Sequence, residues 1–360
     1  AGYSQLEAPL AGWAPVMGVL GIGLILAFTA AALYLTLTRT RGGPAALAAS
    51  ALLWTAGPLL ERADWTAPAG APLAVAMVQG NIAQEPKWEP GQLEAILDTY
   101  VAMSEPLWGT ELVVWPEAAV PAYLDLVVDR LAPLAARSVQ SGSTLLLGIP
   151  TRDANEAKRR GFDAFNSIAV IGADSGLYHK RRLVPFGEYV PLKGLLGFLN
   201  RLVPAAGDFA TGDRIAPLEL REASAGILIC FEAIFPEISR VMVREGADVL
   251  VNLTNDAWFG VSSAPHQHLS MSVFRAVENR RPLIRAANTG ISAIIDSRGR
   301  IMQRTELFEE ETLMATIHLS KGAPKSTRLD AIAVRKRAAT KGDLVVEVKP
   351  GEEAVSVNVG

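Results

Sequence analysis

The chain opens with apolar stretches that are long enough to cross a membrane. Residues 13–38 contain no charged side chain, and a transmembrane helix needs roughly 20 apolar residues. A second uncharged stretch, residues 44–60, lies at the short end of that range. The alternatives for the first stretch are a buried core helix and a signal peptide, but no basic region precedes it and it is too long for the latter. We therefore predict two transmembrane helices within residues 1–65.

Basic residues between the two stretches predict how the helices are oriented. Arg39 and Arg41 form a short basic loop, and such loops stay in the cytoplasm. Arg62 after the second stretch opposes this orientation, but Glu61 and Asp64 flank it. The part after residue 60 is therefore expected outside the cytoplasm. Because a membrane segment follows Ala1 so closely, we expect the chain to be the end of a longer membrane bundle.

After a linker rich in Ala, Pro and Gly at residues 67–72, the pattern changes to short apolar runs separated by helical stretches. Strands are expected at residues 75–79, 112–115, 144–149, 168–171, 226–230, 249–253 and 293–296. Helices are expected at residues 90–104, 124–141, 235–245 and 266–279. Residues 174–176 and 297–299 are typical of hairpin turns. This alternation predicts an α/β domain over residues 66–320, followed by a tail of residues 321–360.

The amino-acid composition excludes several classes of protein. Half of the residues are hydrophobic and 20% are charged, which excludes a disordered or fibrous chain. The net charge of −3 leaves no basic surface for nucleic acid, so no nucleic-acid partner is expected. One cysteine excludes a disulfide framework and a multi-cysteine cluster, and the four histidines form no HExxH pattern. We therefore expect neither a metal nor another cofactor.

The single cysteine lies where a nucleophile is often found. Cys230 ends an apolar run, and the chain must then turn into a helix. At such a turn the side chain is exposed at the edge of the sheet, and the following backbone N–H groups are free to bind an oxyanion. The alternative is a small buried hydrophobic residue, which is the usual role of a lone cysteine.

Two further residues carry candidate chemistry. Glu117 follows another apolar run beside Trp115 and Pro116, where an ionised carboxylate is disfavoured and proton transfer near neutral pH becomes feasible. The alternative is a solvated loop glutamate. Lys180 lies in a basic run before a Pro-Phe-Gly turn, and its charge suits an oxyanion and favours a thiolate. The alternative is that the basic run with Lys180 forms a solvent-exposed surface.

The order of these residues resembles a known family. Trp-Pro-Glu at 115–117, Lys-x-x-Leu-Val-Pro-Phe-Gly-Glu at 180–188 and Cys-x-Glu at 230–232 resemble the Glu–Lys–Cys constellation of the nitrilase, or carbon–nitrogen hydrolase, superfamily. Further segments resemble one membrane branch of it, the apolipoprotein N-acyltransferases. These segments are residues 2–5, 9–12, 78–82, 87–88, 255–260, 266–268, 280–282 and 288–291. The resemblance covers about residues 1–320.

The resemblance implies a four-layer αββα sandwich preceded by transmembrane helices. It also implies Cys230 as nucleophile, Glu117 as general base and Lys180 as oxyanion stabiliser. The positions that match the supporting and lipid-facing residues of the family are Glu188 and Glu232, the backbone N–H of Phe231, and Trp88 and Trp258. Relatives often have tyrosine where Phe231 stands.

The implied reaction is an acyl transfer in two steps. An acyl chain passes from a phospholipid to Cys230, and then to the α-amino group of the S-diacylglyceryl cysteine of an apolipoprotein. The implied location is a bacterial inner membrane, crossed more than once, with the catalytic domain on the periplasmic side. A membrane-tethered amidase of the same fold, with water as the second acceptor, is the alternative. A non-catalytic binding domain requires all three motif residues to be coincidental.

Two regions extend or depart from the family pattern. Phe198 and Leu199 belong to an apolar stretch at residues 185–209, which we interpret either as an arm that admits acyl chains or as a helix packed on the domain. Residues 322–360 contain no membrane-length apolar stretch, although the family usually ends with one. Residues 341–359 alternate like a strand pair instead.

Overall fold

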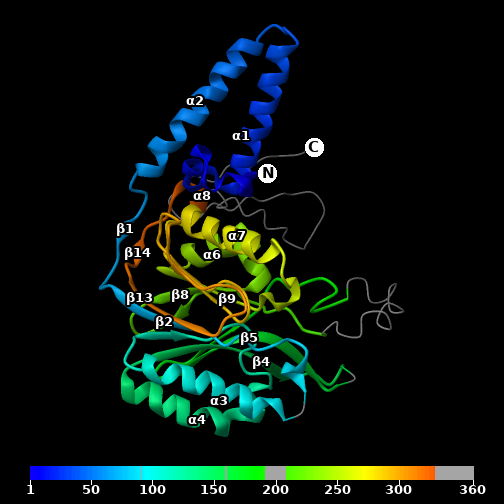
Figure 1. Ribbon diagram of the computed structural model, residues 1–360, viewed down its shortest axis with the longest axis vertical. Coiled ribbons are helices and arrows are strands. Elements are labelled where there is room, and N and C mark those ends of the chain that lie inside the picture. Colours follow the sequence, from blue (N-terminus) through cyan, green and yellow to red (C-terminus); the bar gives the residue numbers. More distant parts are fainter. Residues whose placement is uncertain (90, 159, 191–207, 329–360) are drawn as a thin grey trace, which may run out of the picture. The chain divides into compact units, whose positions relative to one another are not determined.

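The structure is a computed structural model that describes residues 1–89, 91–158, 160–190 and 208–328, and these residues form two compact units (Figure 1). One unit contains residues 1–65 and the segment that begins at Ala323. The other unit is Thr66–Gly322. Phe198, Leu199 and the tail after residue 328 lie outside the described residues, so the predictions made for them stay predictions.

Two long helices make up most of the part of the first unit that the structure describes. The helix α1 (Ala14–Leu37) and the helix α2 (Gly43–Arg62) are joined by the basic turn. Both are long and apolar enough to cross a membrane, in agreement with the sequence. The shorter helices of this unit are η1 (Gly2–Gln5), η2 (Pro9–Trp13) and α8 (Lys325–Arg328).

Small and polar residues join the elements of the first unit. The hydroxyls of Thr29 and Ser50 lie 2.8 Å apart, and the indole N–H of Trp54 donates to Thr29 over 3.1 Å. At Gly12 and Gly57 the backbones approach so closely that a Cβ atom at either position would overlap a carbonyl oxygen. Small-residue contacts and interhelical hydrogen bonds of this kind are typical of helices that pack in a membrane.

The outer surface of α1 and α2 carries large apolar side chains. The exposed leucines are Leu20, Leu24, Leu33, Leu37, Leu52 and Leu59. A core helix of a soluble domain buries such side chains, whereas a contiguous exposed apolar surface marks contact with a membrane or a partner. The exposed leucines are therefore not consistent with α1 and α2 being core helices of a soluble domain.

Two six-stranded sheets form the centre of the second unit. The strands of one sheet are β2 (Leu73–Gln79), β3 (Leu112–Val114), β4 (Thr144–Ala154), β5 (Phe162–Gly172), β6 (Gly176–His179) and β13 (Glu311–Ile317), in the order β13–β2–β3–β4–β5–β6. The strands of the other are β7 (Leu218–Glu219), β8 (Ser224–Ile229), β9 (Val249–Thr254), β10 (Leu283–Ala287), β11 (Ala293–Ile295) and β12 (Ile301–Arg304), in the order β12–β11–β10–β9–β8–β7. A short pair, β1 (Ala67–Pro68) and β14 (Ser320–Lys321), joins the two ends of the unit.

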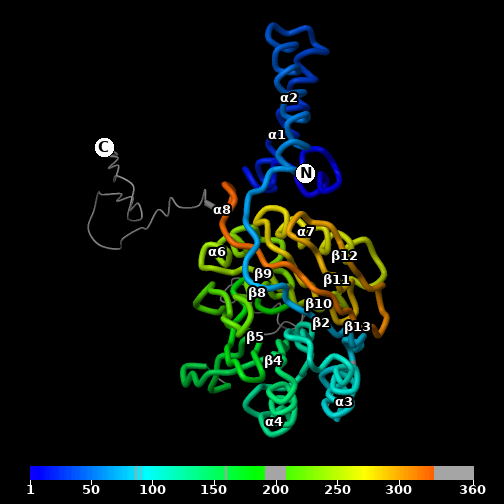
Figure 2. The backbone as a smooth tube through the Cα atoms, turned by 90° about the vertical axis from the view of Figure 1, so that its left-hand side faces the viewer, coloured from blue at the N-terminus to red at the C-terminus, as the bar shows by residue number. Residues whose placement is uncertain are grey.

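Helices cover the outer faces of both sheets. The helices α3 (Gln92–Ser104) and α4 (Leu124–Ser141) pack on the first sheet, and α6 (Pro236–Arg244) and α7 (Ala264–Asn279) pack on the second. Figures 1 and 2 show the resulting order of helices, sheet, sheet and helices. The predicted α/β class and four-layer αββα sandwich are confirmed. Short 3-10 helices follow the strands β2, β8 and β9, and these are η3 (Pro86–Trp88), η6 (Cys230–Ile234) and η7 (Asp256–Phe259). Another, η4 (Glu105–Leu107), follows the helix α3.

The apolar pattern accounts for most of these elements. Side chains of β2 to β5 and of α3 and α4 form one continuous buried cluster around Trp115 and Tyr100, whose rings stack 4.9 Å apart. Besides the short pair β1 and β14, the sequence analysis predicted no strand at β6, β7, β10, β12 or β13. Arg285 interrupts the short apolar run of β10, and β13 alternates between buried and exposed positions.

Candidate active site

The candidate residues follow strands whose ends meet. Glu117 lies just after β3, and Cys230 lies directly after β8. The strands β8, β9 and β10 are parallel, as are β2, β3 and β4. Their carboxyl ends lie along one edge of each sheet, which is where ligands bind in open α/β sheets. Lys180 follows β6 and completes the set.

Glu117 and Lys180 form a buried ion pair. The Nζ atom of Lys180 donates to Oε1 of Glu117 over 3.1 Å, and only 1% of the Lys180 side chain is exposed. Burial alone would lower the pKa of Lys180, but the carboxylates of Glu117 and Glu188 outweigh it and hold this pKa above its usual value. The lysine is therefore a fixed positive charge, and the solvated basic face considered from the sequence is wrong for this residue.

Two further side chains surround this ion pair. Glu188 accepts from Nζ of Lys180 over 3.0 Å and from the backbone N–H of Val184 over 2.8 Å. Asn166, on β5, donates to both Glu117 and Glu188 over 2.7 Å. The second oxygen of Glu117 accepts from the backbone N–H of Asn255 over 2.9 Å. The side chain of Glu117 is thus held in one orientation.

Cys230 occupies a strained turn between β8 and η6. Its φ of +47° lies in the left-handed region, which a residue with a Cβ atom rarely adopts. Its thiol interacts with Glu117, Lys180 and the Thr254 hydroxyl. Burial and Glu117 raise the pKa of this thiol to about 12, although Lys180 and Thr254 act in the opposite direction. Lys180 therefore favours the thiolate as expected, but the thiol remains protonated near neutral pH and needs a base.

Glu232 connects the turn at Cys230 to the segment that carries Lys180. Its fully buried carboxylate accepts from the backbone N–H groups of Arg181 over 2.6 Å and Ile229 over 2.9 Å, and from the hydroxyl of Tyr178. Burial raises the pKa of Glu232 to about 7, even though these backbone donors favour its ionised form. The carboxylate therefore holds the turn at Cys230 at a fixed distance from the segment that carries Lys180.

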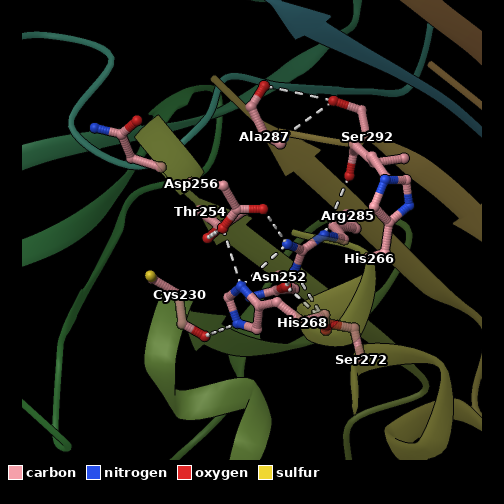
Figure 3. A network of polar contacts seen from close by, with 12 residues as sticks. Cys230, Asn252, Thr254, Asp256, His266, His268, Ser272, Arg285, Ala287 and Ser292 are labelled. Atoms are coloured by element: carbon pink, nitrogen blue, oxygen red, sulfur yellow. Dashed lines mark hydrogen bonds and ion pairs between the residues drawn. The ribbon is translucent and has the colours of Figure 1, made fainter. Parts of the chain in front are cut away.

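A second polar network lies behind Cys230 (Figure 3). Nε2 of His268 lies 3.1 Å from the carbonyl oxygen of Cys230, and its Nδ1 lies 2.9 Å from Asp256. Arg285 donates to the other oxygen of Asp256 over 2.7 Å. Burial alone would raise the pKa of Asp256, but Arg285 and His268 outweigh it and lower this pKa to about 2. Asp256 is therefore ionised at any working pH.

The loops beside the site carry exposed aromatic residues. Trp88 is 50% exposed and Trp258 is 66% exposed. The two loops are joined by a 2.6 Å hydrogen bond from the Asn255 side chain to Gln84. Lys87, next to Trp88, is 1% exposed, and its Nζ has no hydrogen-bond partner among the residues that the structure describes. Burial lowers the pKa of Lys87 to about 8, and Glu117 partly opposes this shift.

The sequence pattern of the carbon-nitrogen hydrolase family matches residues 74–324. The chain belongs to this family. The match includes Glu117, Lys180 and Cys230, and it covers nearly the whole of the second unit.

Curated relatives within the carbon-nitrogen hydrolase family align with a larger part of the chain than the family pattern does. The apolipoprotein N-acyltransferase of Geobacter metallireducens is 45% identical over 256 residues, which are 70% of this chain and 49% of that protein. The apolipoprotein N-acyltransferases of Methylococcus capsulatus and Pseudomonas aeruginosa are each 40% identical, over 89% and 88% of this chain. These matches span 64% and 62% of the two relatives. The chain therefore spans between about half and two thirds of the length of these relatives.

Solved structures support the same fold for this family member. A carbon-nitrogen hydrolase from Helicobacter pylori aligns with a TM-score of 0.51 at 17% identity, over 72% of this chain and 91% of that structure. A member of branch 10 of the nitrilase superfamily from Saccharomyces cerevisiae has the same TM-score and identity, over 77% of this chain and 99% of that structure. At this identity the likeness shows the fold alone.

The structure brings together most of the residues that the sequence singled out. Glu117, Lys180, Glu188 and Cys230 interact directly, and Glu232 holds the turn. The sequence analysis assigned no role to the other residues of the site, which are Asn166, Thr254, Asp256, His268, Arg285 and Lys87. A lone arginine within the apolar run of β10 was the signal that could have pointed to a buried ion pair.

Proposed function

We propose that this chain carries an N-acyltransferase that moves an acyl chain from a phospholipid, through a thioester on Cys230, to the α-amino group of the S-diacylglyceryl cysteine of an apolipoprotein. The Glu117–Lys180 ion pair beside Cys230 supports the acyl-transfer chemistry most directly. The two membrane-length helices and the similarity to proteins named apolipoprotein N-acyltransferase support the lipid substrate.

The first half-reaction forms the thioester. Glu117 accepts the proton of the Cys230 thiol while the sulfur attacks the ester carbonyl of the phospholipid. Lys180 and the backbone N–H of Phe231 stabilise the negative oxygen of the tetrahedral intermediate. The first N–H groups of a helix lack partners within that helix, and Phe231 lies at such a position in η6. The carbon–oxygen bond then breaks, and the proton on Glu117 passes to the departing lysophospholipid.

The second half-reaction transfers the acyl chain to nitrogen. The amine of the apolipoprotein attacks the thioester carbonyl, and the same donors stabilise the oxyanion. Glu117 accepts the proton of the amine and returns it to the sulfur as the carbon–sulfur bond breaks. Because the thiol has a pKa of about 12 in this site, a base must accept its proton in the first step and a proton must be returned to the sulfur in the second.

The domain roles follow from the same proposal. Residues 1–65 hold the enzyme in a bacterial inner membrane as part of a multi-pass bundle, and residues 66–320 form the catalytic domain on the periplasmic side. The basic turn with Arg39 and Arg41 faces the cytoplasm. Trp88 and Trp258 contact the lipid substrate, because exposed indole rings favour the interface between apolar and aqueous phases.

A labelling experiment tests this function. The full chain in detergent is incubated with a phospholipid that carries a radiolabelled acyl chain, and a hydroxylamine-sensitive label on Cys230 is expected. Addition of a diacylglyceryl-cysteine peptide with a free amine should then move the label to the peptide. The Cys230→Ala variant is the control, because it removes every thiol of the chain. Hydrolysis of small amides without lipid labelling would favour an amidase, and the absence of both activities would refute an enzymatic role.

A further inference from the structure

The carbonyl group of the nucleophile has a dedicated partner. The His268 ring, on α7, is buried and places Nε2 at 3.1 Å from the carbonyl oxygen of Cys230. Figure 3 shows that this oxygen points to His268, whereas the sulfur of Cys230 points away from it. A carbonyl oxygen only accepts hydrogen bonds, so His268 must donate from Nε2 in this contact.

Behind His268, a chain of buried charges holds the ring in place. Asp256 contacts Nδ1 of His268 over 2.9 Å and accepts from Arg285 over 2.7 Å. Arg285 is itself fixed by Ser272, over 3.0 Å, and by the backbone carbonyl of Ile291, over 3.1 Å. Asp256, His268 and Arg285 come from η7, α7 and β10, so three separate elements determine the position of the ring.

The backbone at Cys230 needs such a restraint. Its positive φ is unfavourable for a residue with a side chain, and backbone conformations of this kind persist only where the surroundings enforce them. The peptide unit between Cys230 and Phe231 is planar and trans, so its carbonyl and its N–H point in opposite directions. A hydrogen bond that fixes the Cys230 carbonyl therefore also fixes the direction of the Phe231 N–H.

We propose that His268, held by Asp256 and Arg285, is a positioning residue that sets the plane of the Cys230–Phe231 peptide and thereby aims the Phe231 N–H at the oxyanion. This inference rests on the proposed role of Cys230 as nucleophile. His268 touches neither substrate nor sulfur in it. Its loss leaves the thiol and Glu117 in place and removes the alignment of one oxyanion donor.

Two substitutions at His268 separate this role from a general structural one. In His268→Gln the amide nitrogen lies near the position of Nε2 and can still donate to the Cys230 carbonyl. In His268→Asn the amide nitrogen lies near the position of Nδ1 and does not reach the carbonyl. Both variants keep a polar side chain beside Asp256. His266→Asn is the matched control, because His266 lies on the same helix and is exposed.

Two rates are measured on the full chain in detergent. The burst of p-nitrophenolate from p-nitrophenyl butyrate reports attack of the thiol on an ester, which requires the oxyanion donor. Alkylation by iodoacetamide reports the thiol alone, because no oxyanion forms. We expect the burst rate of His268→Asn to fall by about 10²–10³-fold, which is the usual effect of losing one such donor. We expect its alkylation rate to change by less than about threefold and the burst of His268→Gln to stay within about tenfold of wild type.

The possible results distinguish this inference from the proposed function. Equal bursts for the Gln and Asn variants, or a parallel loss of burst and alkylation, would overturn the positioning role. A normal burst in the wild-type chain without labelling by phospholipid would refute the proposed lipid substrate and leave the positioning role standing. A wild-type chain without any burst would remove Cys230 as nucleophile and both proposals with it.

Discussion

The buried amine of Lys87 gives the sharpest test of the physical reasoning. The side chain is 1% exposed, and its Nζ contacts no hydrogen-bonding group among the described residues. A buried charge without a partner destabilises a folded protein, and removal of that charge is expected to stabilise it. Lys87→Met keeps a chain of similar length and volume and removes the ammonium. We therefore expect this variant to be more stable than the wild type.

The lowered pKa of Lys87 sets the magnitude and the pH range of this effect. The pKa falls from 10.5 in the unfolded chain to about 8 in the folded chain. Between these values the unfolded state binds one proton more, so the stability of the wild type rises as the pH increases from 8 to 10.5. Below pH 8 the ammonium costs the folded state about 3 kcal/mol. Lys87→Met should be more stable by about this amount at pH 6.5, and the difference should shrink toward pH 10.5.

Thermal unfolding of the full chain in detergent, followed by tryptophan fluorescence, measures this difference at pH 6.5 and pH 10. Lys321→Met is the control, because Lys321 is exposed and its removal should change stability by less than about 0.5 kcal/mol. A Lys87→Met variant that is less stable than wild type at pH 6.5, or a gain that is the same at both pH values, would refute the reasoning.

Three further predictions concern the site itself. Glu232→Gln replaces a carboxylate oxygen that faces backbone donors by an amide, so the unfolding free energy should fall by about 2–3 kcal/mol in thermal melts. An unchanged melting temperature would show that the hydrogen bonds to Glu232 contribute little to stability. Asn166→Asp removes the donor shared by Glu117 and Glu188 and adds a third carboxylate, so the burst with p-nitrophenyl butyrate should fall at least about 10²-fold. The alkylation rate of Cys230 in the wild type should rise with pH without a plateau below about pH 10, since its thiol has a pKa of about 12, and a plateau near pH 7 would contradict this.

Much of the fold could be predicted because burial dominates the pattern. The strands β2, β3, β8 and β9 are largely apolar and buried, as expected for strands covered by helices on one side and by a second sheet on the other. The strand β10 could not be recognised in this way, because Arg285 lies at its centre. A charged residue is tolerated there only through partners that come from distant parts of the chain, and such partners leave no local signal.

The site could be predicted in part for a similar reason. Glu117 and Cys230 each follow an apolar run, so their places at strand ends could be read from the pattern. Lys180 lies in a basic run, and its place directly after β6 was not predicted. Asn166 lies within a strand and looks like any polar residue of an alternating segment. His268 belongs to a helix whose inward face becomes visible only when α7 is packed on the sheet. Contacts between distant elements, rather than residue type, give these two residues their roles.

The arrangement of the two sheets explains why so many charges are buried around the site. Glu117 and Lys180 follow strands of one sheet, whereas Cys230 and Asn255 follow strands of the other. The nucleophile therefore approaches its base and its cation only across the space between the sheets. Packing of apolar side chains is not directional enough to fix such an approach, but hydrogen bonds to a carboxylate are. Glu117 reaches across to the backbone of Asn255, and Glu232 reaches back to the segment that carries Lys180, so these two carboxylates set the geometry on which acyl transfer depends.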